Sequence, residues 1–346
     1  MHLTIVASGV VNQDQVIVGI DNGGTKNAVT VLTRGGEFLI DEMIEFPSRV
    51  TEGPAVAIPA LVDAFHAGLH RTGHSIGDVI AIGLDTPGPA SASGVLSSRG
   101  ATNFSGVEWH GFDIRSALED AIGIRVVYSN DGNAAALYAH HVHFRSIANA
   151  ASSISAIIGT GCGGGVIEGG SIITGSTGTA GELGHVHVPM DGLLADGQPL
   201  PRCNCGFHGD VESIASLTGI TNNLLPYWLT RYPDHPLQGL PVKQAAMQVR
   251  SFGERGDEMA LAIFEQQAIA LGRLFTIAAH FVDPDAFFIG GGAVEADPHF
   301  RDWFVDRIRH HTTLRAEQMP AFALVPDLDM AGARGAAMNA IGRFAG

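Results

Sequence analysis

The segment RCNCGFHGDVES contains the kinds of side chain that bind metal ions in proteins. Cys203 and Cys205 are separated by one residue, and a histidine, an aspartate and a glutamate follow them. The chain has only three cysteines, so a four-cysteine zinc site within one chain is excluded. Because zinc also binds imidazole nitrogen and carboxylate oxygen, a metal held by this segment would have to recruit histidine or carboxylate ligands.

Three glycine-rich turns each follow an apolar run typical of a strand: DNGGTK (21–26), GTGCGGG (159–165) and GGG (290–292). Glycine allows backbone amides to approach a phosphate closely, and rows of amide N–H groups form anion-binding concavities. None of the turns has the Walker spacing, and none has G-x-G-x-x-G opening a helix. One such turn alone favours an ordinary tight hairpin. Three turns, in a chain whose opening pattern recurs at 153–173, favour phosphate binding.

The sequence SNDGN places Asp131 where an apolar strand ends and a helical pattern begins. Ligands of open α/β sheets gather at the carboxyl ends of strands, where a carboxylate could accept the proton of an attacking hydroxyl. Asp131 taken alone is more typical of a helix N-cap than of a base, and that interpretation stays open.

Hydrophobic periodicity predicts the elements that must position these groups. Strands are expected on both sides of the glycine turns at 15–32 and 153–173, and at 78–84, 124–131 and 285–294. Helices are expected over 54–72, 132–141, 257–281 and 330–344. Strands that alternate with helices predict an α/β fold.

Composition argues against several classes of partner and location. The formal net charge of −15 argues against a nucleic-acid partner, because phosphate contacts need Lys and Arg. Three cysteines do not form a disulfide framework, which favours a reducing, cytoplasmic location. The apolar residues 3–11 are too few to span a membrane, and no Lys or Arg precedes them, so neither a membrane partner nor a signal peptide is expected.

From about residue 16 to the end, the order of the motifs resembles the ROK family of sugar kinases and related repressors. The matching segments are DNGGTK, TPGP, SNDGNAAAL, IGTGCGGG, GELGH, CNCGFHG and FFIGGG. The resemblance implies an actin-like, hexokinase-like (ribonuclease H-like) fold with two α/β domains around a cleft. It also implies ATP with Mg²⁺ as cofactor, a small-molecule sugar as substrate, and a homodimer. Asn22 departs from the family, which commonly has an apolar residue there.

The resemblance implies roles for matching positions. Asp131 would be the general base. The other expected sugar-binding residues are Asn103, Asn130, Glu182, His185 and Glu212. Asp21 would position the magnesium ion. The expected ATP-binding residues are Asp21, Gly23, Gly24, Thr25, Lys26, Gly159, Thr160, Gly161, Gly291 and Gly292.

The family also carries a structural zinc held by the histidine of GE-x-GH and three cysteines. His185, Cys203 and Cys205 match that pattern, but Asp210 stands in the place of the third cysteine. The preferred ligand set is His185, Cys203, Cys205 and Asp210. Two alternatives stay open: His208 could replace Asp210, or the cysteines could be small buried hydrophobic residues without a metal.

The expected activity is an ATP-dependent hexose kinase, with the 6-hydroxyl of glucose as the default acceptor. Kinases of N-acetylhexosamines, fructose, allose and mannose share these motifs, and residues around 85–105 and 182–212 are expected to choose among them. A sugar-sensing repressor is disfavoured, since only about 15 residues precede the first hairpin and the chain is acidic. A sugar-binding protein without catalysis is the remaining alternative. The domains are expected at 16–133 and 134–330, with the helix at 331–344 packing back on the first.

Overall fold

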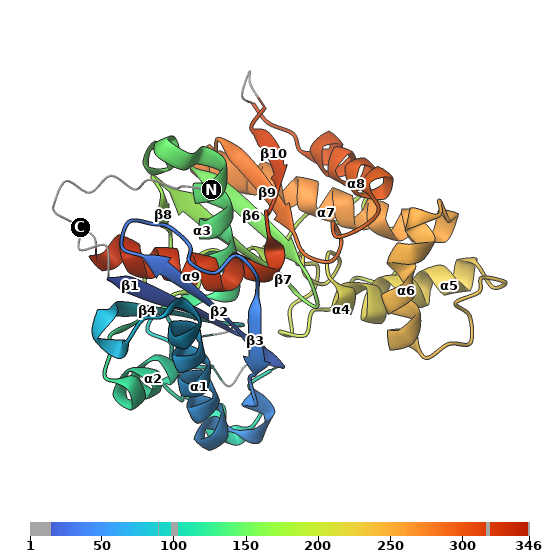
Figure 1. Cartoon of the computed structure of the whole chain (residues 1–346). Helices are drawn as coiled ribbons and strands as arrows, with labels where there is room; N and C mark the ends of the chain where they lie inside the picture. The colour runs from blue at the N-terminus through green and yellow to red at the C-terminus, as the bar shows by residue number, and fades with distance from the viewer. Residues whose placement is uncertain (1–14, 89, 98–102, 316–318, 345–346) are drawn as a thin grey trace. The chain divides into compact units, whose positions relative to one another are not determined.

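The computed structural model describes residues 15–88, 90–97, 103–315 and 319–344 (Figure 1). Residues 3–11, and residues 98–102 of the segment expected to select the sugar, lie outside this part of the chain. The described strands are β1 (Val16–Asn22), β2 (Lys26–Thr33), β3 (Ile44–Pro47), β4 (Val79–Thr86), β5 (Val126–Asn130), β6 (Ser153–Ile158), β7 (Cys162–Glu168), β8 (Ser171–Ile172), β9 (Ala286–Gly290) and β10 (Ala321–Leu324). The described helices are α1 (Pro54–Thr72), α2 (Ile114–Ile122), α3 (Asp131–Phe144), α4 (Leu217–Gly219), α5 (Leu225–Arg231), α6 (Val242–Glu254), α7 (Glu258–Val282), α8 (Pro298–His311) and α9 (Leu328–Phe344).

The chain divides into two compact units. Unit 1 consists of Met1–Ala151, Gly165–Gly181 and Val325–Gly346, and unit 2 consists of Ser152–Gly164 and Glu182–Leu324. The boundary expected between 133 and 134 falls inside α3, which lies wholly in unit 1.

Unit 1 contains a five-stranded sheet of order β3-β2-β1-β4-β5. The first three strands are antiparallel neighbours, as the glycine hairpin predicts, whereas β1, β4 and β5 run parallel. Parallel strands end at the same edge of a sheet. The register therefore places Asp21 directly beside Asp85, and Thr86 beside Asn130, at the carboxyl ends of β1, β4 and β5.

Helix α9 packs on one face of this sheet, against β1 and β4, and also contacts α3 (Figure 1). The contact is backbone to backbone. A Cβ atom at Gly19 would lie 2.1 Å from the carbonyl oxygen of Ala333, and one at Gly83 would lie 2.0 Å from that of Ala336. Only glycine permits so close an approach. The other face is covered by α1, whose buried Leu61 and neighbouring apolar residues join the core of the sheet.

Unit 2 is built around a sheet whose strand order is β10-β9-β6-β7-β8; its last part, from Gly165 of β7 through β8, is counted with unit 1. The long helix α7 packs on β6 and α8, and Phe275 of α7 stacks on Phe287 of β9 with ring centroids 4.5 Å apart. By length and composition α7 could also cross a membrane, but most of its apolar window is buried in the protein, as in an ordinary core helix.

All of the strands and helices expected from periodicity are present, with shifts of a few residues at their ends. The pattern did not identify the edge strands β3 and β10. Both have partly exposed or exposed residues and only four positions, too few for a clear alternation.

The contact of α9 with the sheet leads to a stability prediction. We expect Gly83→Ala to lower the free energy of unfolding by about 1–3 kcal/mol, because the new methyl group would force α9 away from β4. Urea unfolding followed by circular dichroism measures the change. Gly77→Ala is the matched control, because its nearest heavy atom would be the Ser75 hydroxyl oxygen at 3.7 Å. Equal stability of the two variants would contradict the backbone contact.

Candidate functional site

The first glycine turn joins β1 to β2, and the amide of Gly23 closes it by donating to the carbonyl oxygen of Lys26 at 2.9 Å. Asn103 lies against this turn: a Cβ atom at Gly24 would be 2.5 Å from its side-chain oxygen. Thr25 and Lys26 are exposed. The structure therefore brings one expected sugar-binding residue next to an expected ATP-binding turn within unit 1.

Lys26 is paired with an acidic residue of the neighbouring strand. Its ammonium donates to Glu45 of β3, and this hydrogen bond raises the pKa of Lys26. The ammonium is exposed, so this surface ion pair contributes little to stability.

The unusual Asn22 has a polar partner across the hairpin. Asn22 and Asn27 face each other in the register of β1 and β2, and the side-chain amide of Asn22 donates to the side-chain oxygen of Asn27 at 2.5 Å. Both side chains are fully buried. This bond satisfies Nδ2 of Asn22 and Oδ1 of Asn27, whereas Oδ1 of Asn22 and Nδ2 of Asn27 are buried without a hydrogen-bond partner among the described residues. The second asparagine therefore offsets only part of the cost of burying the first.

Asn130 and Asp131 take different places at the start of α3. Asn130 is the N-cap, and its side-chain oxygen accepts from the amides of Gly132 at 2.9 Å and Asn133 at 3.4 Å. Asp131 is the first residue of the helix, partly exposed, and one carboxylate oxygen accepts from the Gly132 amide at 2.7 Å. The capping interpretation therefore applies to Asn130 rather than to Asp131.

Sequence reasoning missed a buried acid in this region. Asp85 ends the apolar run of β4, and its side chain has no exposed surface. Burial raises the pKa of Asp85 well above its ordinary value, and the charges of Asp21 and Asp131 raise it further. The signal was available: in VIAIGLDT an aspartate directly follows an apolar run.

The second and third glycine turns lie in unit 2. The second, with Gly159, Thr160 and Gly161, joins β6 to β7, and the third follows β9. The carbonyl oxygens of Gly159 and Thr160 accept from the amides of Leu217 and Thr218 at 2.9 and 3.1 Å. These bonds fix the turn to the segment where α4 begins.

Both turns line one cavity of about 310 Å³. Gly159, Thr160 and Gly292 contribute polar backbone, whereas Ile220 and Phe264 contribute apolar surface. Arg250 also lines the cavity, and its guanidinium donates to the carbonyl oxygen of Gly292 at 2.5 Å. A mostly apolar hollow with a few polar groups on its rim is typical of a site for a small organic ligand.

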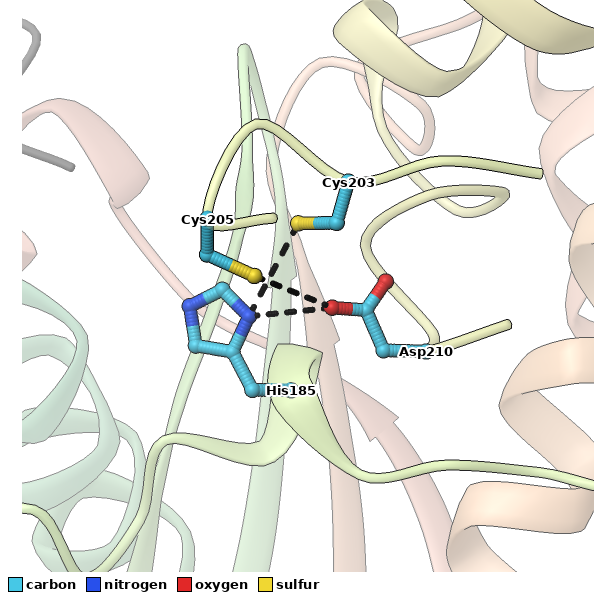
Figure 2. Close-up of side chains that lie close together, drawn as sticks. All are labelled: His185, Cys203, Cys205 and Asp210. Carbon is cyan, nitrogen blue, oxygen red and sulfur yellow. Dashed lines mark hydrogen bonds and ion pairs between the residues drawn. The ribbon is translucent and has the colours of Figure 1, made fainter. Parts of the chain in front are cut away.

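The expected metal ligands of unit 2 converge (Figure 2). Nδ1 of His185 lies 3.2 Å from a carboxylate oxygen of Asp210 and 3.9 Å from Sγ of Cys203. Sγ of Cys205 lies 3.6 Å from the same carboxylate oxygen. One ligand atom from each of the four residues lies within 4.8 Å of the others. His208 is exposed and lies outside this cluster.

The spacing of these atoms suits zinc. Tetrahedral Zn²⁺ with bonds of about 2.0–2.3 Å places its ligand atoms about 3.3–3.8 Å apart. The three distances above lie close to this range. Two sulfurs, one imidazole nitrogen and one carboxylate oxygen are also donors that zinc accepts. The residues present therefore fit the metal that the sequence suggested.

Charges inside the cluster are already complementary. A hydrogen bond from His185 to the carboxylate of Asp210 raises the pKa of His185. Burial alone would raise the pKa of Asp210, but hydrogen bonds from His185, Cys203 and the Ser213 amide lower it overall. Burial raises the pKa of the Cys203 thiol. Without a cation this thiol stays protonated, and a bound metal would take the place of its proton.

Glu212 connects the metal cluster to the second glycine turn. One carboxylate oxygen accepts from the amide of Cys162 at 2.9 Å, and the other lies 3.3 Å from Sγ of Cys203. The amide of Glu212 donates to the carbonyl oxygen of Gly184 at 2.7 Å. Glu182 is close enough for the charges of His185 and Glu212 to affect it, and burial raises its pKa. Three of the expected sugar-binding residues thus gather in unit 2.

The environment of the remaining cysteine disfavours the reactive thiolate form. Cys162 is buried, and burial together with the charges of Glu212 and Asp210 raises its pKa. A thiol held in its protonated form is a poor nucleophile. Cys162 therefore serves as a small residue that fills space at the start of β7.

Known proteins resemble this chain over nearly its whole length. The ROK family model matches residues 17–342. A glucokinase from Halalkalibacterium halodurans is 31% identical over 287 residues, 82% of each chain. An N-acetyl-D-glucosamine kinase from Escherichia coli strain K12 is 31% identical over 327 residues, 92% of this chain and 97% of the relative.

Solved structures of ROK family proteins also resemble this chain over nearly its whole length. A ROK hexokinase from Thermus thermophilus superposes with a TM-score of 0.75 at 29% identity, covering 96% of this chain and 100% of the other. A ROK family glucokinase from Streptomyces griseus, in complex with glucose and AMPPNP, has a TM-score of 0.68 at 26% identity, covering 93% and 98%. The chain therefore belongs to the ROK family and has the two-domain, actin-like ATPase fold of its hexokinases.

Proposed function

We infer that this protein is an ATP-dependent sugar kinase that transfers the γ-phosphoryl group to a hydroxyl of a hexose. The observation that carries this inference is the cavity of unit 2, which two of the three glycine turns line together. Its apolar floor suits a purine ring, and its rim offers backbone amides. The relatives named glucokinase and N-acetyl-D-glucosamine kinase support the same reaction class.

ATP is proposed to place its adenosine in this cavity, beside Gly291 and Gly292, and its phosphates along Gly159–Gly161. The residues proposed for the first phosphate turn are Asp21, Gly23, Gly24, Thr25 and Lys26. Phosphoryl transfer needs positioning and charge neutralisation more than covalent chemistry. Mg²⁺ would supply that neutralisation, and Asp21 is the carboxylate proposed to position it.

Asp131 is proposed as the general base. A carboxylate at this place could accept the proton of the attacking sugar hydroxyl. The other residues proposed to bind the sugar are Asn103, Asn130, Glu182, His185 and Glu212. Amide, carboxylate and imidazole groups together match several sugar hydroxyls, and a sugar that lacks one hydroxyl would leave a partner unpaired.

Zinc at His185, Cys203, Cys205 and Asp210 is proposed to act indirectly. Nδ1 of His185 points into the cluster, whereas the other ring nitrogen points away from it (Figure 2). A metal on Nδ1 would fix the tautomer, so that Nε2 carries the proton and can donate to a sugar oxygen. The metal would also hold the loop that carries Glu212.

The 6-hydroxyl of glucose is the proposed acceptor. N-acetylhexosamine, fructose and allose kinase activities are the alternatives within the family, and a sugar-sensing protein without catalysis is the alternative outside this reaction class. We further propose that the protein is cytoplasmic and forms a homodimer. Light scattering after size-exclusion chromatography would measure its oligomeric state.

Substrate and mechanism are tested together by ADP release from ATP and Mg²⁺ over glucose, mannose, fructose, allose, N-acetylglucosamine and N-acetylmannosamine. We expect one sugar to react much faster than the others. Asp131→Asn should lower kcat for that sugar by about 100-fold to 10,000-fold, because the amide does not accept the proton.

Asp63→Asn, an exposed substitution on α1, is the matched control and should leave kcat unchanged. If no sugar reacts faster with the unaltered protein than with Asp131→Asn, while calorimetry still detects sugar binding, the kinase proposal is wrong. The protein would then be a sugar-sensing protein.

Metal content tests the zinc proposal. We expect about one zinc per chain by mass spectrometry of the purified protein, with loss of zinc in Asp210→Ala and retention in Asp210→Cys and His208→Ala. Asp210→Cys supplies a thiolate ligand and so separates loss of metal binding from loss of folding. Loss of zinc in His208→Ala with retention in Asp210→Ala would reverse the ligand assignment.

Removal of zinc by a chelator should raise the KM for the sugar more than it changes the affinity for ATP. The reason is that the cluster would orient His185 and Glu212, whereas the cavity proposed for ATP is lined by other residues. Equal changes in both constants would contradict this indirect role.

A further inference from the structure

Two carboxyl groups lie side by side at the end of the sheet of unit 1. Asp21 of β1 and Asp85 of β4 are direct neighbours in the parallel register. Successive residues of a strand alternate between faces, so Asp21 shares a face with Gly19, and Asp85 shares one with Gly83. Both glycines contact α9, so both carboxyl groups are on the α9 face.

Asp85 is enclosed more completely than any other acid proposed for the reaction. Its side chain has no exposed surface, whereas Asp21 and Asp131 are partly exposed. Among the described residues, no N–H group is hydrogen-bonded to either oxygen of Asp85, and the side chain within hydrogen-bonding reach is the carboxyl group of Asp21. An ionised carboxylate buried without a donor is strongly destabilised, so this position requires a proton or a cation.

The charges around Asp85 are of the wrong sign to stabilise it. Asp21 and Asp131 are the two groups whose charges act on it, and both are acidic. The nearest lysine in sequence to Asp21 is Lys26, whose ammonium is taken by Glu45. Helix α9 packs directly against the Asp21 carboxylate, since a Cβ atom at Gly332 of this helix would lie 2.8 Å from one of its oxygens.

We propose that Asp85 joins Asp21 as a second carboxylate ligand of a divalent cation. The identification of that cation as the Mg²⁺ that accompanies ATP rests on the proposed kinase function. Magnesium is a hard cation that binds oxygen and commonly takes one or two protein carboxylates. Among the described residues, the charge of Lys26 acts on Asp21 but no positive charge acts on Asp85, so these two adjacent acids can provide such a pair. The ion would satisfy Asp85 and neutralise the repulsion between the two carboxylates.

The test measures the metal rather than catalysis. Mn²⁺ replaces Mg²⁺ as the probe, because its free form is counted directly by electron paramagnetic resonance. The unaltered protein, Asp85→Asn and the exposed control Asp63→Asn are titrated with Mn²⁺, with and without the non-hydrolysable analogue AMPPNP. We expect Asp85→Asn to raise the Kd for Mn²⁺ at least about tenfold, and Asp63→Asn to leave it unchanged.

Thermal unfolding without metal separates a metal ligand from a structural acid. An amide at position 85 removes a like charge from beside Asp21, so the metal-free Tm of Asp85→Asn should equal or exceed that of the unaltered protein. A lower Tm together with an unchanged Kd for Mn²⁺ would overturn the proposal. Asp85 would then be a protonated structural acid that donates a hydrogen bond to Asp21.

Crystals of the unaltered protein grown with Mn²⁺ and AMPPNP test the proposal without a substitution. Anomalous scattering from Mn²⁺ within about 2.3 Å of a carboxylate oxygen of Asp85 supports it, and a Mn²⁺ peak beside Asp21 alone overturns it. The sugar panel stays a separate test. If the unaltered protein phosphorylates a sugar, but it and the Asp85→Asn variant have the same Kd for Mn²⁺, only this inference is refuted. A protein that reacts with no sugar refutes the kinase function, whatever its affinity for Mn²⁺.

Discussion

The arrangement of unit 1 depends on the close contact between α9 and the sheet. Gly19 and Gly83 let the helix backbone approach β1 and β4 to a distance that any side chain would prevent. The helix therefore covers the carboxyl ends of these strands and removes Asp85 from water. A charged group in such a place has either a partner or a strongly shifted pKa. The packing of one helix thus determines the chemistry available at the edge of the sheet.

In unit 2 a single side chain joins the candidate metal ligands to the second glycine turn. Glu212 accepts a hydrogen bond from the amide of Cys162 in the second glycine turn and contacts Cys203 of the metal cluster. Its own amide is fixed to Gly184, next to His185. The carboxylate therefore joins the cluster to the start of β7, whereas Gly159 and Thr160, at the other end of the turn, line the cavity. Packed polar contacts of this kind hold ligand-binding groups more firmly than exposed loops do.

The sequence was informative where a feature depends on local spacing. The glycine hairpins, α1 and α7 were predictable because turn residues and apolar periodicity are local properties. The four metal-ligand candidates were also found, although residues 185 and 203 are far apart in the chain, because the motif order of the family relates them. Asp210 was already preferred to His208 because it stands at the position of the family's third cysteine, and the structure places Asp210 within the cluster and His208 outside it.

Pairings across strands were not predictable in the same way. The Asn22–Asn27 pair requires the hairpin register, and the Lys26–Glu45 pair requires β3, whose four residues show no clear pattern. Asp85 was visible as an acid in an apolar run, but its meaning depends on its neighbour in β1. Side chains that meet through parallel register are set by tertiary structure, which periodicity does not report.

The carboxylate at position 210 has a consequence for metal selectivity. A cluster of three thiolates and one imidazole is a soft donor set that strongly favours zinc and copper(I) over harder ions. With Asp210 in place of one thiolate, the cluster of Figure 2 has the same formal charge but a harder donor, as well as one fewer sulfur that oxidants could modify. If the proposed site binds a metal, cobalt(II) and iron(II) would therefore compete more effectively for it than for a site with three cysteines. Its metal content would then follow the metal supply of the cell more closely.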